Sequence, residues 1–540
     1  MFLLIVFFSM FILMNADDSV FVKSKLPIVV ISTNGQTIPD EPKIQAEMGI
    51  IFHEDGSENF LTDEFDHYHG YIGIERRGSS SAMFPKKQYA IETWDENGED
   101  LETEIMLMPE EEDWILHAPY SDKTLMRNVL AYDLARDLGW YSSRVLYCEA
   151  VLNGVYQGVY IWMEKIKRDK NRVDVSKLTE DENSGMDLTG GYIIKVDKFE
   201  GSNTQGFYSN YGSDSGDSKK VYYQYHYPAE DDITEEQKAY IQNYIHTLED
   251  LIMADDYRNN SYKDYLYLES FADYFIINEI TKNVDGYRLS AYFYKNKDDK
   301  DPRLAAGPVW DYNLAFGNAD YYEGYTREGW QWQYFRDVNY FHMADPFHPP
   351  CYWFRLLNDP VFIQMVKDRW TELRQTLLHD DYFHNKIDSI RSHLGEAVDR
   401  NYKKWPVLGM YVWPNYYIGA TYDDEIYFLK EWIDDRMEWL DSAFESLTPD
   451  TFIKTSHWNS QENFITVYPN PNRGSFTVRL SSPLPVNSKI DIFDLLGRKV
   501  YSLQNHDRFY EQKFQPAGLK SGAYFISING FIKSSFTVIK

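Results

Sequence analysis

Hydrophobic and polar residues alternate along much of the first half of the chain, and a period of two predicts β-strands. Asn153-Gly154 stands between two such runs, and this dipeptide is typical of a two-residue hairpin turn. One stretch has helical spacing instead, with Ser121 or Asp122 as the expected N-cap and Gly139 at its end. The predicted strands are 26–32, 46–52, a strand pair within 68–93, 114–116, 144–152, 156–166 and 190–197.

From residue 234 onward the apolar positions recur with the period of helices. In the last predicted helix the apolar residues form a single stripe, which indicates a face buried in the core. Strands first and helices second predict an α+β fold with a β-rich N-lobe and an α-rich C-lobe. The predicted helices are 234–253, 262–281, 360–378, 382–400 and 423–447.

A second strand pair, at 287–294 and 304–310, interrupts the helices and is joined by the polar turn 297–301. Asp285 comes just before this pair, and Asp311 comes at its end. A hairpin would hold the two carboxylates near each other, and acidic groups at strand ends hold the base and the metal in many phosphoryl-transfer sites. Both aspartates could equally cap local backbone as turn formers. Spacing alone leaves both interpretations open.

A loop of small residues, Arg77-Gly78-Ser79-Ser80-Ser81, joins two predicted strands. Such a loop exposes backbone N–H groups and hydroxyls, a donor array that suits phosphate. Lys86 and Lys87 follow where the next strand begins, as a lysine follows the phosphate cover of a kinase in layout, although the motif differs. Serine-rich hairpin loops are also common without any ligand, and paired lysines usually lie in solvent. Glu164, on a later strand, is either a surface carboxylate or a partner for Lys86 or Lys87.

Composition excludes some classes of partner. The chain has 540 residues, and 54 Lys and Arg against 84 Asp and Glu give a net charge of −30. Nucleic acid and anionic membranes need a basic footprint, so neither is an expected partner. ATP needs only a local basic pocket and is not excluded. The two cysteines, Cys148 and Cys351, could pair but form neither a disulfide framework nor a metal-binding spacing.

The first 14 residues are almost uninterrupted apolar sequence, which has the length of a signal-peptide core and is too short for a membrane span. With Ala16 as the cleavage position, residues 1–16 are predicted to be a signal peptide. No other stretch reaches 18 apolar residues, so no transmembrane span is expected. The segment 200–219 is predicted to be a loop or flap, and 321–341 an aromatic loop.

Six blocks of sequence follow one another along the chain: RGSSS at 77–81, PKKQYAIE at 85–92, DWILHAPYSDKTLMRN at 113–128, LNGVYQGVYIWMEKI at 152–166, NVDGYRLSAYFYKN at 283–296 and GPVWDYNLAFGN at 307–318. Together they resemble the CotH kinase family of atypical protein kinases. The resemblance implies that Asp285 is the catalytic aspartate and that Asp311, helped by Asn313, binds Mg²⁺ or Mn²⁺. It also implies that Lys86 or Lys87 and the loop from Arg77 to Ser80 hold the nucleotide, and that Glu164 is the family's glutamate.

Three positions depart from the family pattern. Ser79 stands where the family commonly has Asn, and Ser290 where some members have Asn. Asn313 replaces the second aspartate of the usual WD-x-D. Asn remains an oxygen ligand but carries no charge, so it predicts weaker metal binding.

A polar stretch at 448–462 separates the rest of the chain from 463–540, where short strands alternate with turns. Regular spacing of this kind predicts a small β-sandwich. The sequences YPNP, DLLGR and GAY in this region resemble the C-terminal sorting domain of type IX secretion. That resemblance implies contact with the type IX machinery and delivery to the cell surface or outside the cell.

The sequence therefore predicts a CotH-like domain at 26–447, a linker at 448–462 and a sorting domain at 463–540. The expected function is that of a secreted kinase that uses ATP with Mg²⁺ or Mn²⁺ to phosphorylate Ser or Thr of a protein. ATP is scarce outside cells, so two alternatives stay open. One is an inactive surface adhesion or scaffold protein. The other is a carbohydrate-binding protein that uses Trp330 and Trp332 of the aromatic loop.

Overall fold

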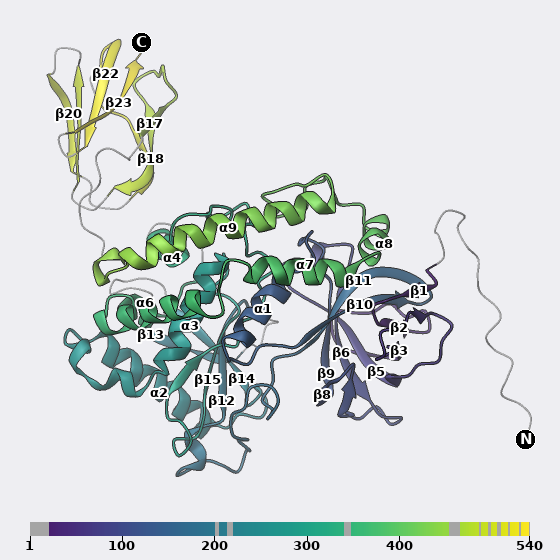
Figure 1. Cartoon of the computed structure of the whole chain (residues 1–540). Coiled ribbons are helices and arrows are strands. Elements are labelled where there is room, and N and C mark those ends of the chain that lie inside the picture. Colours follow the sequence, from purple (N-terminus) through teal and green to yellow (C-terminus); the bar gives the residue numbers. More distant parts are fainter. Residues whose placement is uncertain are drawn as a thin grey trace, which may run out of the picture.

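The structure is a computed structural model. The fold combines helices with several β-sheets (Figure 1). The predicted signal peptide, most of the predicted linker and most of the predicted flap lie outside the described residues. The structure describes residues 21–199, 205–212, 220–339, 347–452, 465–484, 488–494, 498–504, 509–516, 519–528 and 531–538.

The alternating residues of the first half form a closed barrel with the strand order β10-β11-β9-β6-β5-β3-β2. One face of each strand supplies the apolar cluster of the barrel, which includes Ile72, Ile91, Trp114 and Trp162. In Figure 1 the barrel lies at one end of the main body. The barrel strands are β2 Ile28–Ser32, β3 Ile44–Ile51, β5 Tyr68–Arg77, β6 Gln88–Trp94, β9 Asp113–His117, β10 Val145–Leu152 and β11 Val155–Glu164, and short pairs are formed by β1 Lys23–Ser24 with β4 Asn59–Phe60 and by β7 Thr103–Ile105 with β8 Met108–Glu111.

The predicted hairpin at Asn153-Gly154 is confirmed, since Leu152 of β10 pairs with Val155 of β11. Asn153 and Gly154 have φ values of 50° and 76°, the left-handed conformations that this tight turn requires. The Asn153 side chain also binds a neighbouring strand end: it accepts a hydrogen bond from the Thr33 backbone N–H at 2.8 Å and donates one to Thr33 Oγ1 at 2.9 Å.

The first helix, α1 Arg127–Asp137, begins later than predicted. Its N-cap position is Met126, which gives no side-chain cap. Asp122 still serves the helix start, because its carboxylate accepts from the backbone N–H of Arg127 at 2.8 Å and pairs with the Arg127 guanidinium at 2.6 Å. The expected capping carboxylate is therefore present, but it reaches the helix from an ordered turn ahead of it.

A second sheet, with the order β13-β14-β12-β15-β16, is packed against helices α2 and α3. Its edge strand β13 lies inside the segment predicted to be a loop, and this prediction is wrong for 206–212, because Phe207 pairs with Tyr223 of β14. These elements are β12 Tyr192–Val196, β13 Gly206–Gly212, β14 Lys220–Tyr227, β15 Ala291–Lys295, β16 Leu304–Ala306, α2 Glu235–Met253 and α3 Leu268–Thr281.

The remaining helices complete the main body, with the long α9 running along it (Figure 1). Gly395, at φ 43°, divides the predicted helix 382–400 in two. Trp330 and Trp332 are only 6% and 1% exposed, and Trp330 packs on Phe444 of α9, so neither forms a binding face. The helices are α4 Gln331–Asn339, α5 Cys351–Leu356, α6 Pro360–Gln375, α7 Tyr382–Leu394, α8 Ala397–Lys404 and α9 Tyr422–Ser446.

The C-terminal strands form two sheets, β17-β18-β21 and β20-β19-β22-β23. Val478 of the first sheet and Ile492 and Ile526 of the second belong to one apolar cluster. Cys148 and Cys351 are both buried and unpaired. Within the described residues, no helix is both long and apolar enough to span a membrane. The strands are β17 Ile465–Tyr468, β18 Phe476–Leu484, β19 Lys489–Asp494, β20 Lys499–Gln504, β21 Phe509–Phe514, β22 Gly522–Ile528 and β23 Phe531–Val538.

Candidate active site

The predicted hairpin exists and positions both aspartates, but from its flanks and not from its strand ends. β15 pairs with β16 through Phe293 and Ala306. Asp285 lies in the turn between α3 and β15, and Asp311 lies in the loop that follows β16. β15 begins later than the alternation predicts because Tyr287 and Ser290 have φ values of 67° and 49°, which an extended strand does not allow.

Asp285 is held in place by its own turn. The Asn283 side chain accepts a hydrogen bond from the Asp285 backbone N–H at 3.1 Å, and the Arg288 guanidinium lies 3.6 Å from Asp285 Oδ1. The residue is buried, with 9% of its surface exposed. A buried carboxylate beside a single cation keeps a free oxygen edge that can accept a proton or a hydrogen bond.

Asp311 has the left-handed backbone conformation, at φ 61°. Its backbone N–H donates to the Tyr132 hydroxyl of α1 at 3.1 Å, which fixes the loop against the helix. The side chain is open to solvent through the pocket, yet the surrounding protein desolvates it and raises its pKa to about 6. Repulsion from Asp285 and Asp197 adds to this rise in pKa, and the charges of Arg77 and Lys198 partly oppose it.

Asp197 is a third carboxylate at this place, and the strand register explains its position. β12 and β15 are antiparallel, and Val196 pairs with Ala291. The residue after β12 therefore meets the residue before β15, and the Ser290 hydroxyl donates to Asp197 Oδ2 at 3.4 Å. The next residue, Lys198, reaches toward the barrel, where its ammonium group donates to Ser80 Oγ at 3.2 Å.

The loop after β5 supplies the opposite wall of the site. Arg77 pairs with Gln88 across the β5–β6 hairpin, and the loop between them contains a short 3-10 turn, Ser80–Met83. Gly78 has φ 101°, and a Cβ added there would lie 2.1 Å from Ser81 Oγ. A residue with a Cβ would be strained at this φ and would displace the Ser81 and Gln88 side chains, so glycine is favoured here.

A line of hydrogen bonds runs behind the loop. Gln88 Nε2 donates to Ser81 Oγ at 2.5 Å, and Gln88 Oε1 lies 2.9 Å from His117 Nδ1. Burial, and then the positive charge of Arg77, lower the pKa of His117 to about 3, so the ring is neutral. A neutral ring that donates from Nδ1 to Gln88 accepts at Nε2 from the Asn128 amide, 3.3 Å away.

One pocket brings most of the predicted site residues together. Its wall combines the barrel loop, the three carboxylates, Lys198 and the aromatic residues Tyr132, Trp310 and Tyr321. Arg77 lies over the Trp310 ring at 5.7 Å. The predicted residues in the wall are Arg77, Gly78, Ser79, Ser80, Asp285, Asp311 and Asn313.

Lys86 and Lys87 are not part of this wall. Lys86 is buried, and its ammonium group donates to the Val159 carbonyl and, at 2.9 Å, to Asn401 Oδ1 of α8. Desolvation lowers the pKa of Lys86 to about 7. Lys87 donates to the Ala82 carbonyl at 2.7 Å. These contacts tie the barrel to α8 and close the loop after β5.

Glu164 does not pair with either lysine, so that expectation is wrong. Its carboxylate binds the Arg144 guanidinium at 2.7 Å and accepts from the Arg144 backbone N–H at 2.9 Å. Tyr141 donates to the same carboxylate at 3.2 Å. Glu164 is fully buried and lies outside the pocket wall, where it joins β11 to the segment before β10.

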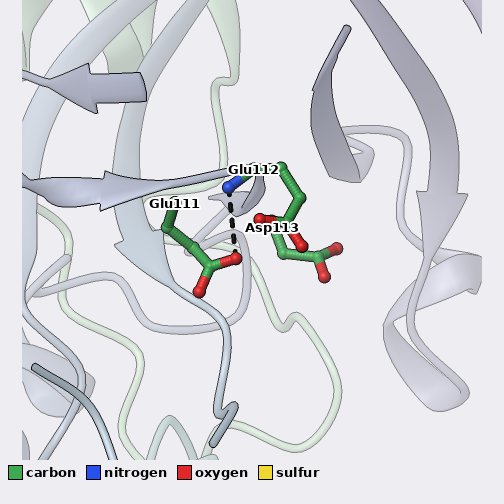
Figure 2. A group of neighbouring side chains, drawn as sticks. All are labelled: Glu111, Glu112 and Asp113. Carbon is green, nitrogen blue, oxygen red and sulfur yellow. Dashed lines mark hydrogen bonds between the residues drawn. The ribbon is translucent and has the colours of Figure 1, made fainter. Parts of the chain in front are cut away.

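A separate acidic cluster, Glu111, Glu112 and Asp113, is drawn in Figure 2. Its three carboxylates come close enough to share an ion, but Lys167 contacts all of them and Lys165 lies 3.0 Å from Asp113. Cations of the chain itself therefore balance this cluster, which joins β8 and β9 to the segment after β11.

Asp197 and Lys198 are the site residues that sequence reasoning missed. The signal available was an acidic residue at the end of the predicted strand 190–197 and a basic residue directly after it. Nothing in that spacing says which strand lies next to it, so only the β12–β15 register brings Asp197 and Lys198 to the hairpin.

Comparison with known proteins shows the family to which the chain belongs. A family model described as CotH kinase protein matches residues 74–440, which is most of the chain, and a model described as a secretion system C-terminal sorting domain matches residues 466–539. The chain belongs to the CotH kinase family. Its sorting domain indicates type IX secretion to the cell surface or the extracellular space.

No curated protein matches the chain. One solved structure with similarity is PorZ, described as an essential bacterial surface component of the type IX secretion system of Porphyromonas gingivalis. The identity is 24%, over 14% of this chain and 11% of that chain, with a TM-score of 0.12. The similarity covers only a small part of PorZ and carries no argument about function.

Proposed function

We propose that the protein is a secreted atypical kinase that transfers the γ-phosphate of ATP to Ser or Thr hydroxyls of a protein, with Mg²⁺ or Mn²⁺. The observation that carries the proposal is a single pocket that joins the carboxylates flanking the β15–β16 hairpin to the small-residue loop of the barrel. A base, a hard-cation site and a phosphate-binding loop in one pocket are the parts that phosphoryl transfer needs.

The side chains that line the pocket fit both a metal ion and the phosphate chain of ATP. Carboxylate and amide oxygens are the ligands that Mg²⁺ prefers, and Asp311 and Asn313 supply one of each. Arg77 and the loop of Gly78, Ser79 and Ser80 supply the cation and the N–H and hydroxyl donors that suit phosphate. Asn128 Oδ1 is buried in the same wall with no hydrogen-bond partner among the described residues, so an acceptor there remains available to a ligand.

Each residue then has a definite task. The γ-phosphoryl group would pass from ATP to the acceptor hydroxyl oxygen while ADP leaves, and a bound metal ion would offset the negative charge of the phosphate oxygens. Asp285, oriented by Asn283 and Arg288, accepts the proton of the acceptor hydroxyl. Asp311 and Asn313 hold the metal ion. Arg77 and the loop donors stabilise the charge on the phosphate chain.

We further propose that residues 26–447 form a two-lobed kinase-like domain, with the barrel as N-lobe. A signal peptide at 1–16 would precede this domain. A linker at 448–462 would join it to a separate β-sandwich at 463–540. The apolar cluster shared by the two C-terminal sheets supports the sandwich. The lysine–glutamate pair of typical kinases has no counterpart in Lys86, Lys87 and Glu164, because Glu164 is bound to Arg144.

The neutral Asn313 supports one rival function, an inactive surface scaffold with weak metal binding. Carbohydrate binding by Trp330 and Trp332 loses its basis, because both rings are buried. The experiment that separates kinase from scaffold is metal-dependent transfer of labelled phosphate from ATP by the purified protein, with Asp285→Asn as the variant that lacks the base.

A further inference from the structure

Lys198 connects the two halves of the pocket. It follows β12 and belongs to the five-stranded sheet, whereas its hydrogen-bond partner Ser80 belongs to the loop of the barrel. The two residues are far apart in sequence, and their 3.2 Å contact joins two parts of the pocket wall that belong to different sheets. A lysine in this place faces any ligand held by the loop.

The charge of Lys198 is available to a ligand. Its partner Ser80 is a neutral hydroxyl, and the described residues give Lys198 no ion pair. Among the described residues that line the pocket, Lys198 and Arg77 are the lysine and arginine side chains, and His117 is neutral. Arg77 and Lys198 line the same pocket as Asp311, the proposed metal ligand.

Lys86 and Lys87 offer no such charge to the pocket. The Lys86 ammonium group is enclosed by Val159, Asn401 and the Tyr160 ring, 4.8 Å from the ring centre. Lys87 is bound to a carbonyl of its own loop. Turning Lys86 into the pocket would break its hydrogen bonds to Val159 and Asn401, and turning Lys87 would break its hydrogen bond to Ala82. The described residues give the Lys198 ammonium group one hydrogen bond to exchange, and its partner is neutral.

We propose that Lys198, together with Arg77, binds the phosphate chain of a nucleoside triphosphate, and that it exchanges its hydrogen bond to Ser80 for phosphate oxygens. The inference rests on the proposed function for the identity of the ligand. Lys198 thus takes the place that the resemblance gives to Lys86 or Lys87. Because Lys198 links β12 to the barrel loop, a bound phosphate chain would join the two walls through one ammonium group.

The test is calorimetric titration of the whole protein with Mg²⁺ and three ligands: ATP, inorganic tripolyphosphate and adenosine. We expect Lys198→Ala to weaken ATP and tripolyphosphate binding at least tenfold and to leave adenosine binding unchanged. Lys198→Arg should restore most of the affinity, since it keeps the charge. Lys170→Ala, at an exposed lysine outside the pocket, is the matched control and should bind like the parent.

Three results would overturn the inference: a parent protein that binds neither phosphate compound, a Lys198→Ala variant that binds ATP as the parent does, or a loss of affinity in Lys87→Ala instead. The second and third leave the kinase proposal standing. Conversely, a parent that binds ATP through Lys198 but transfers no phosphate supports the inference and contradicts the kinase proposal.

Discussion

Two features of Asp311 are unfavourable: its carboxylate lies near other carboxylates, and its backbone has the left-handed conformation. Desolvation and two neighbouring carboxylates raise its pKa to about 6, above the value of an aspartate in an unfolded chain. A carboxyl group with a raised pKa stabilises the fold only while it is protonated. The fold therefore loses stability as pH rises from about 4 to about 6, and above this window the full penalty remains.

We expect Asp311→Asn to be more stable than the parent at pH 8 by about 1 kcal/mol, a value reduced by solvent screening in an open pocket. The difference should disappear near pH 4, where the parent carboxyl is protonated too. Asparagine accepts the φ of 61° at this position, so the change tests charge and not backbone. Urea denaturation with a chelator present, at pH values from 4 to 8, measures it. A variant that is less stable at pH 8 would show that the carboxylate serves as a structural cap.

At the scale of elements, the barrel loop depends on one glycine. Gly78→Ala would place a Cβ 2.1 Å from Ser81 Oγ and 2.5 Å from Gln88 Nε2, at φ 101°. We expect a loss of about 1–3 kcal/mol in the free energy of unfolding, as for other strained backbone positions. Denaturation curves measure the loss.

Gly56→Ala is the matched control for this change. Gly56 also has a positive φ, 76°, but no atom lies within 4 Å of its added Cβ. The free energy of unfolding of the Gly56→Ala variant should fall by about 1 kcal/mol, the cost of a Cβ at a positive φ. Equal losses at the two glycines would contradict the account of the loop, because the contacts with Ser81 and Gln88 would then contribute nothing.

The sequence predicted elements well where local chemistry decides them. Asn153-Gly154 requires a tight hairpin. The predicted helices 234–253 and 423–447 are present as α2 and α9, and the structure shows that Thr234 and Thr421 cap them in capping boxes. It failed where tertiary contacts decide. Strand β13 forms because it pairs with β14. Glu164 binds Arg144 because the fold places these two residues side by side.

For the site, the order of motifs predicted the carboxylates of the hairpin and the barrel loop, and the structure places them in one pocket. Spacing could not say which lysine faces that pocket, because the direction of a side chain depends on which face of the strand is buried. Lys86 points into the protein, whereas Lys198 lies past a strand end, where the chain is free to turn toward Ser80.

At the scale of the whole molecule, the family match ends at residue 440 and the sorting-domain match begins at residue 466. We expect limited proteolysis of the full chain to cut first between 448 and 462, where the sequence is polar. Mass spectrometry of the early fragments gives the position. First cleavage within 283–313 would contradict both the proposed boundary and the buried, bonded turn around Asp285.

We propose that the pocket transfers phosphate from ATP. The direct measurement is incorporation of label from γ-labelled ATP into Ser or Thr of the protein itself and of a mixture of proteins, with Mg²⁺ or Mn²⁺. We expect incorporation that a chelator abolishes and that falls at least 100-fold in Asp285→Asn. Incorporation should persist in Asp299→Asn, which changes an exposed aspartate of the hairpin turn. No incorporation with either metal, or equal incorporation by the parent and Asp285→Asn, would contradict it.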